Sequence, residues 1–479
     1  MASLSNQRPF GQGLTDDLFC LSPSIPSLDG IIAYELKDEN ILPLMKVIYP
    51  RLGFHSILNH LIQSYTSDLS SSFAYIPFPT QKSAILCSDY INKFILSKLD
   101  FTDFNEFTLL KLEHKSYELG LQFIQHSGFC LSPRRAFSIL NGKESLPLDT
   151  QAVSKLKVKL ATAYSVCKDN IFLFPSGMSS YYAALSLLSQ RSSSPILHLG
   201  FPYVDNLKLP KRLFNGVELL PFSRINDLEN LLAANSYSAI SFEFPSNPEL
   251  YVHSLPELNR LSDIYNIPLV ADDTISTPYN TSLIHSVDLV YSSLSKSFSG
   301  YGNVMAGSLC LSPSSSFLDI KDFSCLRELP SLDLYDATQL LGNSKNVEGR
   351  ILLQNKNAYQ IFVFLTNHPL VAKIYHPSIC PSYCQNMRSE DSYGCLVSFE
   401  LVGGYSNFKK FFDSVEFAKG PSLGNVFTMI CPYTFLAHFD EFSFASSNGI
   451  SPFLLRISAG IEDIDECHRR PIDTIKYNI

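Results

Sequence analysis

The sequence lacks the features of a membrane protein or a secreted protein. No apolar stretch in its 479 residues approaches the roughly 20 residues that a helix needs to cross a bilayer. The first residues, MASLSNQRPFGQGLTDD, contain no apolar core followed by a cleavage site, so we expect no secretory signal. The 11 cysteines are scattered and odd in number, which favours reduced thiols over a disulfide framework. These absences predict a cytoplasmic protein without a membrane partner.

An excess of basic charge is also missing. Lys and Arg number 37 against 45 Asp and Glu, so the formal net charge is -8. This balance argues against nucleic acid as a partner. Cys380 and Cys384 share the short segment SICPSYC, but no second pair follows at zinc-site spacing, and we expect no metal site.

Residues 165–310 alternate between strand-like and helix-like patterns. Short apolar runs end in turn residues in NIFLFPSG, PILHLGFP, SAISFEFPSNP, IPLVADDT, VDLVYSSLS and VMAGSLCLS. Amphipathic segments such as MSSYYAALSLLSQ and SLPELNRLSDIYN lie between several of these runs. Buried strands alternating with helices predict a largely parallel sheet in an α/β domain. We place this domain at residues 151–330.

The regions on either side show other patterns. Residues 331–479 contain a long helical stretch, NVEGRILLQNKNAYQIFVFLTNHP, followed by the strand-like segments GCLVSFELVGG and FLLRISAGI. They predict a smaller α+β domain. Residues 1–150 mix helical stretches with proline-rich links, and we interpret them as an N-terminal arm and helical region.

Polar residues follow the predicted strands where these end. Ligands of an open parallel sheet bind outside the carboxyl ends of its strands. The residues in this position are Lys296, Asp272, Asp273, Asn247, Tyr203 and Gly177. We therefore expect them to converge on one edge of the sheet.

These residue types suit a phosphate-bearing aldehyde. Gly177 precedes a helix, and the N-terminus of a helix attracts an anion. The hydroxyls of Ser293 and Ser295 can donate further hydrogen bonds to the same anion, whereas a carboxylate in their place would repel a phosphate. A carboxylate keeps a pyridinium nitrogen protonated, and a lysine amine forms a Schiff base with an aldehyde. The constellation predicts a site for pyridoxal 5'-phosphate.

The same segments resemble the cystathionine γ-synthase group of pyridoxal phosphate enzymes, also called the Cys/Met metabolism family, and most of all its fungal cystathionine γ-synthases. The matching stretches are YPR (49–51), FPSGM (174–178), GFPY (200–203), EFPSNP (243–248), VADDTIST (270–277), SSLSKSFSGYGNVMAGS (292–308), GPSLG (420–424), CPYTFLAHFDE (431–441) and LLRISAGIED (454–463). The resemblance implies fold type I, similar to aspartate aminotransferase, with a large mostly parallel α/β domain and a smaller C-terminal α+β domain.

The resemblance also implies roles for residues around the cofactor. Lys296 would carry the cofactor and shuttle protons, and Asp272 would hold the ring nitrogen. Tyr203 would stack on the ring, with Asn247 near the ring hydroxyl. The groups implied for the phosphate are the backbone N–H groups of Gly177 and Met178 and the hydroxyls of Ser293 and Ser295.

Two further groups are implied to complete the site. Tyr49 and Arg51 match a Tyr-x-Arg pair that reaches the phosphate of the neighbouring subunit, and Tyr49 joins Lys296 and Asp272 as a catalytic residue. This implies a homodimer or homotetramer with shared active sites, in which residues 1–150 reach the neighbour. Arg456 would grip the substrate carboxylate as a fork, assisted by Ser422.

The sequence departs from the family pattern at three places. VDN follows Tyr203 where many members carry Gly-Gly-Thr, Asn425 replaces a second glycine after SLG, and Ser295 replaces a threonine.

The implied reaction is γ-replacement on an O-acylhomoserine by the thiol of cysteine, which gives cystathionine. The partners are thus small amino-acid substrates. Three alternatives stay open: γ-replacement by sulfide or a carbon nucleophile, a cystathionine lyase, and a non-catalytic paralogue.

Overall fold

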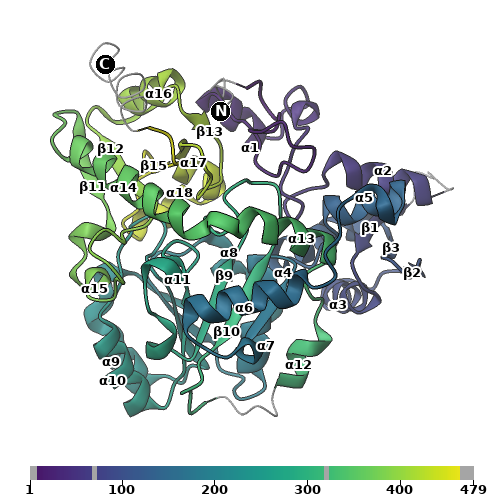
Figure 1. Cartoon of the computed structure of the whole chain (residues 1–479), viewed down its shortest axis with the longest axis horizontal. Helices are drawn as coiled ribbons and strands as arrows, with labels where there is room; N and C mark the ends of the chain where they lie inside the picture. The colour runs from purple at the N-terminus through teal and green to yellow at the C-terminus, as the bar shows by residue number, and fades with distance from the viewer. Residues whose placement is uncertain (1–7, 67–72, 318–322, 464–479) are drawn as a thin grey trace.

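The structure is a computed structural model, and it describes residues 8–66, 73–317 and 323–463. Its centre is a seven-stranded sheet with the order β4-β10-β9-β8-β7-β5-β6 (Figure 1). The strands are β4 (Ile171–Phe174), β5 (Ile196–Leu199), β6 (Val217–Leu220), β7 (Ala239–Glu243), β8 (Leu269–Asp272), β9 (Leu289–Ser293) and β10 (Gly307–Leu311). β10 runs antiparallel to both of its neighbours, and the other pairs are parallel. The predicted α/β fold with a largely parallel sheet is confirmed.

Helices cover both faces of this sheet, which explains why its strands read as continuous apolar runs. In β5, Leu197 and Leu199 pack in one core cluster with α6 (Ala152–Tyr164) and α10 (Leu255–Tyr265). Ile196 points the other way, into a cluster with α7 (Gly177–Ser189). The carboxyl ends of the parallel strands therefore remain the open edge of the layer.

The C-terminal region forms the predicted smaller α+β unit. The long helix α14 (Val347–Thr366) leads into a five-stranded sheet with the order β11-β12-β15-β14-β13. Its strands are β11 (Val371–Tyr375), β12 (Leu396–Leu401), β13 (Ala418–Lys419), β14 (Met429–Pro432) and β15 (Leu455–Ser458). β15 lies in the middle of this sheet, so both of its neighbours hold its backbone in place.

The N-terminal region differs from the helical region that the sequence predicts. It contains a three-stranded antiparallel sheet of β1 (Phe73–Phe78), β3 (Thr108–Glu113) and β2 (Leu99–Asp103), in that order. Helices α2 (Ser56–Tyr65), α3 (Gln81–Asn92), α4 (His114–Ser127) and α5 (Pro133–Asn141) accompany it. Apolar runs as short as those of β1 and β3 fit a strand or a buried helix equally well, so periodicity does not distinguish them.

The first helix joins the other end of the chain. α1 (Leu28–Glu35) lies beside α16 (Gly404–Ser414) and α17 (Tyr433–Ala437), where Figure 1 places purple next to yellow. Leu28 and Ile31 are buried in the same cluster as Phe399 of the C-terminal sheet, and Leu28 N donates to Asp413 Oδ1 at 2.8 Å. The N-terminal segment thus closes over the C-terminal unit before it reaches residue 49.

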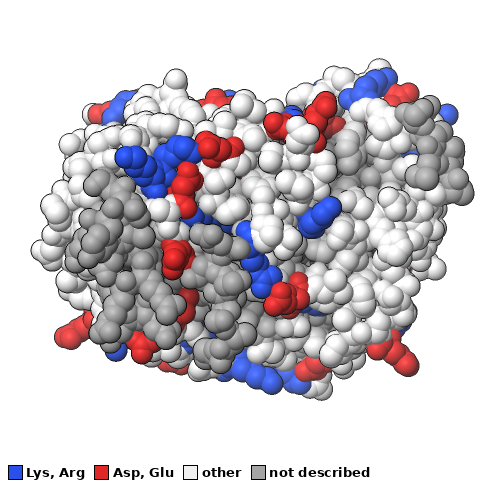
Figure 2. All heavy atoms as spheres, turned by 90° about the horizontal axis from the view of Figure 1, so that it is seen from above, with Lys and Arg blue, Asp and Glu red and all other residues white. Residues whose placement is uncertain are grey.

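Two surface features bear on partners. Among the helices of the described ranges, none is both long enough and apolar enough to cross a bilayer. On the face seen in Figure 2, the described Lys and Arg side chains lie among Asp and Glu rather than gathering by sign.

Candidate active site

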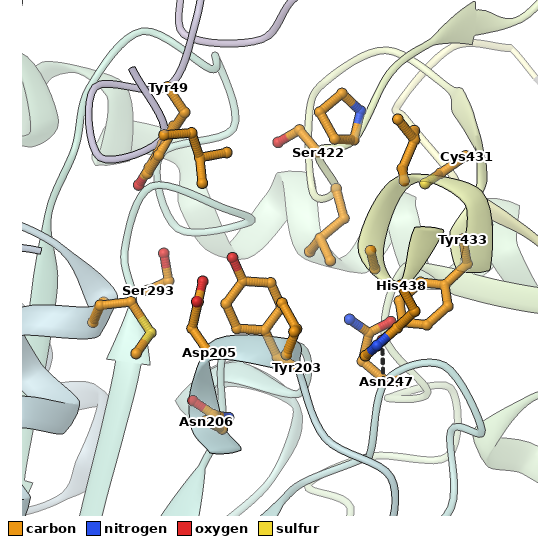
Figure 3. A pocket seen from close by; sticks show the side chains of 18 of the residues that line it. Tyr49, Tyr203, Asp205, Asn206, Asn247, Ser293, Ser422, Cys431, Tyr433 and His438 are labelled. Atoms are coloured by element: carbon orange, nitrogen blue, oxygen red, sulfur yellow. Dashed lines mark hydrogen bonds between the residues drawn. The ribbon is translucent and has the colours of Figure 1, made fainter. Parts of the chain in front are cut away.

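A cavity of about 780 Å³ opens at the carboxyl ends of β7, β8 and β9. The C-terminal unit contributes Arg456 to its wall, and the N-terminal segment contributes Tyr49. Figure 3 shows side chains from these distant parts of the chain around one space. The predicted site residues in its lining are Tyr49, Arg51, Gly177, Met178, Tyr203, Asn247, Asp272, Ser293, Lys296, Ser422 and Arg456. Ser295 is the predicted residue that does not line it.

Lys296 lies in the turn after β9 and extends into the cavity. Its Nζ donates to Ser422 Oγ at 3.4 Å and lies 5.5 Å from the centre of the Tyr49 ring. Burial, together with the positive charges of Arg51 and Arg456, lowers the pKa of Lys296 to about 7. A substantial share of this lysine is therefore a neutral, nucleophilic amine near neutral pH.

Asp272 and Asp273 end β8 but face different surroundings. Asp272 lines the cavity, and its Oδ1 accepts from Thr274 N at 2.8 Å. Burial raises the pKa of Asp272 to about 6. Asp273 lies away from the cavity lining, and its Oδ2 accepts from Tyr164 OH at 2.7 Å.

Glu243 is a site residue that the sequence analysis missed. It ends β7 directly opposite Asp272. Burial is the main cause that raises the pKa of Glu243 well above its usual range, and the charge of Asp272 adds to this effect. Its Oε1 accepts from Tyr203 N at 2.5 Å, and its Oε2 accepts from Asn247 N at 2.8 Å. The acid thus fixes the backbone of two predicted site residues. The signal was present, because Glu243 is the first residue of EFPSNP at a strand end.

The start of α7 and the end of β9 also line the cavity. Ser176 caps the helix by accepting from Ser179 N at 3.1 Å. A Cβ on Gly177 would lie 2.7 Å from Ser293 Cβ, so only glycine lets the helix start approach the strand end this closely. The first N–H groups of a helix have no partner inside it and carry partial positive charge. With the Ser293 hydroxyl beside them, they suit an anion.

Ser295 does not line the cavity but lies next to residues that do. Its Oγ accepts from Ala306 N at 3.0 Å and lies 3.2 Å from Tyr49 OH. The hydroxyl is therefore occupied in holding the turn and Tyr49.

Arg456 projects from the central strand β15 into the cavity. Its Nη1 donates to Asn247 Oδ1 at 2.8 Å, and its Nη2 donates to Ser422 O at 3.1 Å. Within the described part of the chain its Nε has no hydrogen-bond partner, although the residue is only 3% exposed. The guanidinium is held in one orientation with a donor left over. Asn247, predicted near a ring hydroxyl, has its side-chain oxygen on this arginine.

Tyr49 and Arg51 line the cavity of their own chain. The sequence analysis expects them at the site of a neighbouring subunit, and this stays a prediction. Arg51 donates to Asp205 Oδ2 at 2.6 Å and to Tyr203 OH. Asp205 was missed by the sequence analysis as a site residue, and its signal was the VDN departure after Tyr203.

Comparison with known proteins identifies the family. Residues 149–469 match the Cys/Met metabolism PLP-dependent enzyme family. The chain belongs to this family. The predicted resemblance is thereby confirmed, and so is the cofactor, pyridoxal phosphate.

Individual relatives agree with this assignment. A cystathionine gamma-synthase of Neurospora crassa is 36% identical over 317 residues, which cover 62% of this chain and 50% of that protein. A cystathionine gamma-synthase of Saccharomyces cerevisiae is 34% identical over 332 residues, covering 62% of this chain and 52% of that protein. The chain therefore spans about half the length of the curated relatives it matches.

A solved structure supports the fold. The crystal structure of a putative O-acetylhomoserine (thiol)-lyase from Campylobacter jejuni superimposes with a TM-score of 0.61 at 22% identity. The match covers 71% of this chain and 91% of that one.

The residues of the cavity fit pyridoxal phosphate. The Lys296 amine, the Asp272 carboxylate and the Tyr203 ring lie on one cavity. The glycine-permitted approach of α7 to Ser293 leaves helix-start donors at one end, as a phosphate needs.

Proposed function

We propose that the protein catalyses γ-replacement on an O-acyl-L-homoserine, with L-cysteine as the nucleophile and cystathionine as the product. The observation that carries this proposal is one cavity lined both by Lys296, whose pKa is lowered, and by Arg456, whose guanidinium is held by Asn247 and Ser422. The family and its cystathionine gamma-synthase relatives support the same assignment.

Each end of the cavity would hold a different part of the cofactor. Lys296 would bind its aldehyde carbon, Asp272 would accept a hydrogen bond from the ring nitrogen, and Tyr203 would cover the ring. The start of α7 and Ser293 would bind the phosphate. When bound, pyridoxal phosphate supplies an electron sink that stabilises negative charge on the substrate carbons.

The substrate would be oriented by its carboxylate. Arg456 is held by Asn247 and Ser422, and its Nε, which has no hydrogen-bond partner among the described residues, would be satisfied by a substrate carboxylate. A guanidinium binds a carboxylate through two parallel hydrogen bonds, which fixes the direction of the amino acid. In this orientation the α-carbon would point toward Lys296.

Lys296 would then move the protons. As a neutral amine, its Nζ can accept the α-proton of the oriented substrate and return a proton to a neighbouring carbon. Nζ would likewise take the β-proton, so that the γ-acyloxy group could leave as a carboxylate. The thiol would then add at the γ-carbon as its thiolate, and Nζ would return a proton to the β-carbon. The cavity of about 780 Å³ lies in the size range of ligand sites.

The test is a product analysis with purified protein. O-acetyl- and O-succinyl-L-homoserine are each incubated with cysteine, with sulfide and without a nucleophile, and the products are identified by mass. We expect cystathionine from the cysteine reactions as the main product. Formation of 2-oxobutanoate and ammonia at the same rate with and without cysteine would show a lyase instead. Faster turnover with sulfide than with cysteine would reassign the nucleophile.

A further inference from the structure

The carboxyl ends of three neighbouring strands place two acids and a phenol side by side. In the sheet, Asp272 of β8 is the register partner of Tyr291 in β9 on one side and of Glu243 in β7 on the other. All three residues line the cavity. Side chains alternate between the two faces of a sheet, so register partners of parallel strands share a face. For this row it is the face that α7 covers, where Tyr291 packs.

The hydroxyl of Tyr291 is buried without a partner. The residue is only 2% exposed, and within the described part of the chain its OH makes no hydrogen bond of ordinary geometry. A buried hydroxyl left in this way costs free energy. The ring is stacked on that of Tyr181 in α7, with the ring centres 4.6 Å apart and the planes at 22°. The phenol is therefore held in place by its ring while its donor is available.

Asp272 and Tyr291 lie close enough to affect each other. Burial raises the pKa of Asp272 to about 6, and the donors Thr274, Asn206 and Tyr291 oppose this rise. Burial, followed by the charge of Asp272, raises the pKa of Tyr291 well above its usual range. The phenol thus keeps its proton wherever the carboxylate is charged, so it can act towards Asp272 only as a donor.

The other two donors have further partners. Asn206 of α8 (Val204–Leu213) donates through Nδ2 to Glu243 Oε1 at 3.0 Å. The hydroxyl of Thr274 accepts from Ser293 N at 2.8 Å, which ties it to the end of β9. Of the three donors, Tyr291 is the one whose hydroxyl is engaged by nothing else in the described ranges.

The surroundings of Asp272 make such a donor important. The titratable groups that the structure places around it are Glu243 from β7, Asp273 next to it, Tyr291 from β9, Tyr181 from α7 and Tyr164 from α6. These neighbours are acids or phenols. Hydrogen bonds from neutral donors must therefore stabilise the charged form of Asp272 before a cationic ring is bound.

We propose that Tyr291 is a positioning residue for the ring end of the active site, where its hydroxyl donates to the Asp272 carboxylate and keeps it charged and directed at the ring nitrogen of the cofactor. This proposal rests on the proposed placement of the cofactor ring in the cavity. The proton of the ring nitrogen is shared between a pyridine and a carboxylate. A donor that stabilises the carboxylate therefore keeps this proton on the ring.

The first experiment observes the ring nitrogen itself. The holoenzyme is loaded with pyridoxal 5'-phosphate that is isotopically labelled at this nitrogen, and its chemical shift is recorded by solid-state NMR for the wild type and Tyr291→Phe. Phenylalanine keeps the stacked ring and removes only the hydroxyl. A hydrogen bond to a charged group contributes enough that the ratio of protonated to neutral ring nitrogen should fall about tenfold. The shift should then move towards that of a neutral pyridine.

Tyr164→Phe is the matched control. The Tyr164 hydroxyl donates to Asp273 Oδ2 at 2.7 Å, so this variant removes a buried phenol hydroxyl from the other acid of the pair. The nitrogen shift should stay that of the wild type. An unchanged shift in Tyr291→Phe, with a neutral ring in Asp272→Asn, would overturn the role of Tyr291 alone. A ring that stays protonated in Asp272→Asn would overturn the placement of the cofactor as well.

The second experiment asks whether Tyr291 acts through the ring nitrogen. Equilibrium dialysis of the cofactor-free full chain gives dissociation constants for pyridoxal 5'-phosphate and for its 1-deaza analogue, in which a C–H group replaces that nitrogen. Tyr291→Phe should weaken pyridoxal phosphate about tenfold and leave the analogue unchanged. In the Asp272→Asn background the same change should have no weakening effect, because Tyr291 acts through the carboxylate. Equal weakening of both cofactors would show that the hydroxyl supports packing alone.

A second variant keeps the test decisive if Tyr291→Phe does not fold. Tyr291→3-fluorotyrosine retains the hydroxyl as a more acidic and stronger donor. The pH at which the ring nitrogen is half protonated should therefore rise, and an unchanged or lower value would contradict the proposal. None of these measurements uses an acylhomoserine, so a failed synthase assay leaves their outcomes separate.

Discussion

Asp272 and Asp205 line the same cavity, yet their surroundings shift their acidities in opposite directions. Asp272 ends β8 opposite another carboxylate, Glu243, and burial raises the pKa of Asp272 to about 6. Asp205 starts α8 between Arg51 and His126, which outweigh burial and lower its pKa to about 2. At its ring end the cavity thus presents the Asp272 carboxylate, which suits a protonated ring nitrogen. At the other end, Arg51 neutralises the Asp205 carboxylate.

The largest effect is expected at Lys296, which lies between the two ends. Lys296→Ala should abolish measurable turnover, because it removes the amine that binds the aldehyde and moves the protons. Borohydride reduction of the wild-type holoenzyme should fix the cofactor on the peptide that contains Lys296. Lys419 is a matched control, because burial also lowers its pKa, to about 8, outside the cavity. Lys419→Met should keep the label, and a label on Lys419 would contradict the assignment.

Asp272→Asn should remove the carboxylate that supports the ring nitrogen. A neutral side chain there no longer supports a protonated ring nitrogen, so kcat should fall by on the order of a thousandfold with the cofactor still bound. Asp273→Asn is the control, because its carboxylate bonds Tyr164 rather than the cavity. It should reduce kcat by less than about tenfold, the scale of one neutral hydrogen bond. Equal effects of the two substitutions would show that position in β8 does not separate their roles.

Arg456→Lys should affect the substrate and leave both cofactor ends intact. Lysine keeps the charge but cannot form the two parallel hydrogen bonds, so KM for the acylhomoserine should rise by about 10- to 100-fold. The absorption spectrum of the bound cofactor should stay unchanged. A KM equal to that of the wild type would mean that Arg456 only braces Asn247 and the backbone at Ser422.

The smallest expected effect lies in the pH dependence of stability, measured on cofactor-free protein by urea unfolding. The pKa of Asp272 is raised on folding, so its favourable contribution is present below about pH 4 and is lost as the pH rises through 6. The free energy of unfolding of Asp272→Asn relative to the wild type should therefore increase by about 3 kcal/mol between pH 4 and 8.

Asp205 should show the opposite sign in the same measurement. Its pKa is lowered on folding, so its stabilising contribution is complete above about pH 4 and is lost only as the pH falls toward 2. Asp205→Asn should be less stable than the wild type by at least about 2 kcal/mol, and this difference should stay constant from pH 5 to 8. If the free energies of unfolding of the two variants changed with pH in the same way, the opposite pKa shifts of Asp272 and Asp205 would be contradicted.

The strand-end residues could be predicted because their placement is local. Asp272 and Lys296 each follow a buried run within a few residues, and consecutive parallel strands bring such ends to one edge. Gly177 and Ser293 belong to the same class, since a strand, a turn and a helix start are adjacent in the chain. The family resemblance added Arg456, which no local pattern would have connected with residues 209 positions earlier.

The rest was decided by tertiary contacts between distant segments. Arg51 meets Asp205 across 154 residues and His126 stands behind that aspartate across 79, and neither pairing leaves a periodic trace in the sequence. Likewise, the segments of β1 and β3 form strands rather than helices because they pair with each other and β3 also pairs with β2. Side-chain periodicity shows which face of a segment is buried, and turn residues show where the segment ends. The sequence by itself therefore determined the strands and helices of the central domain and the residues at the strand ends. Which buried charge neutralises which depends on packing that brings remote residues within a few ångströms.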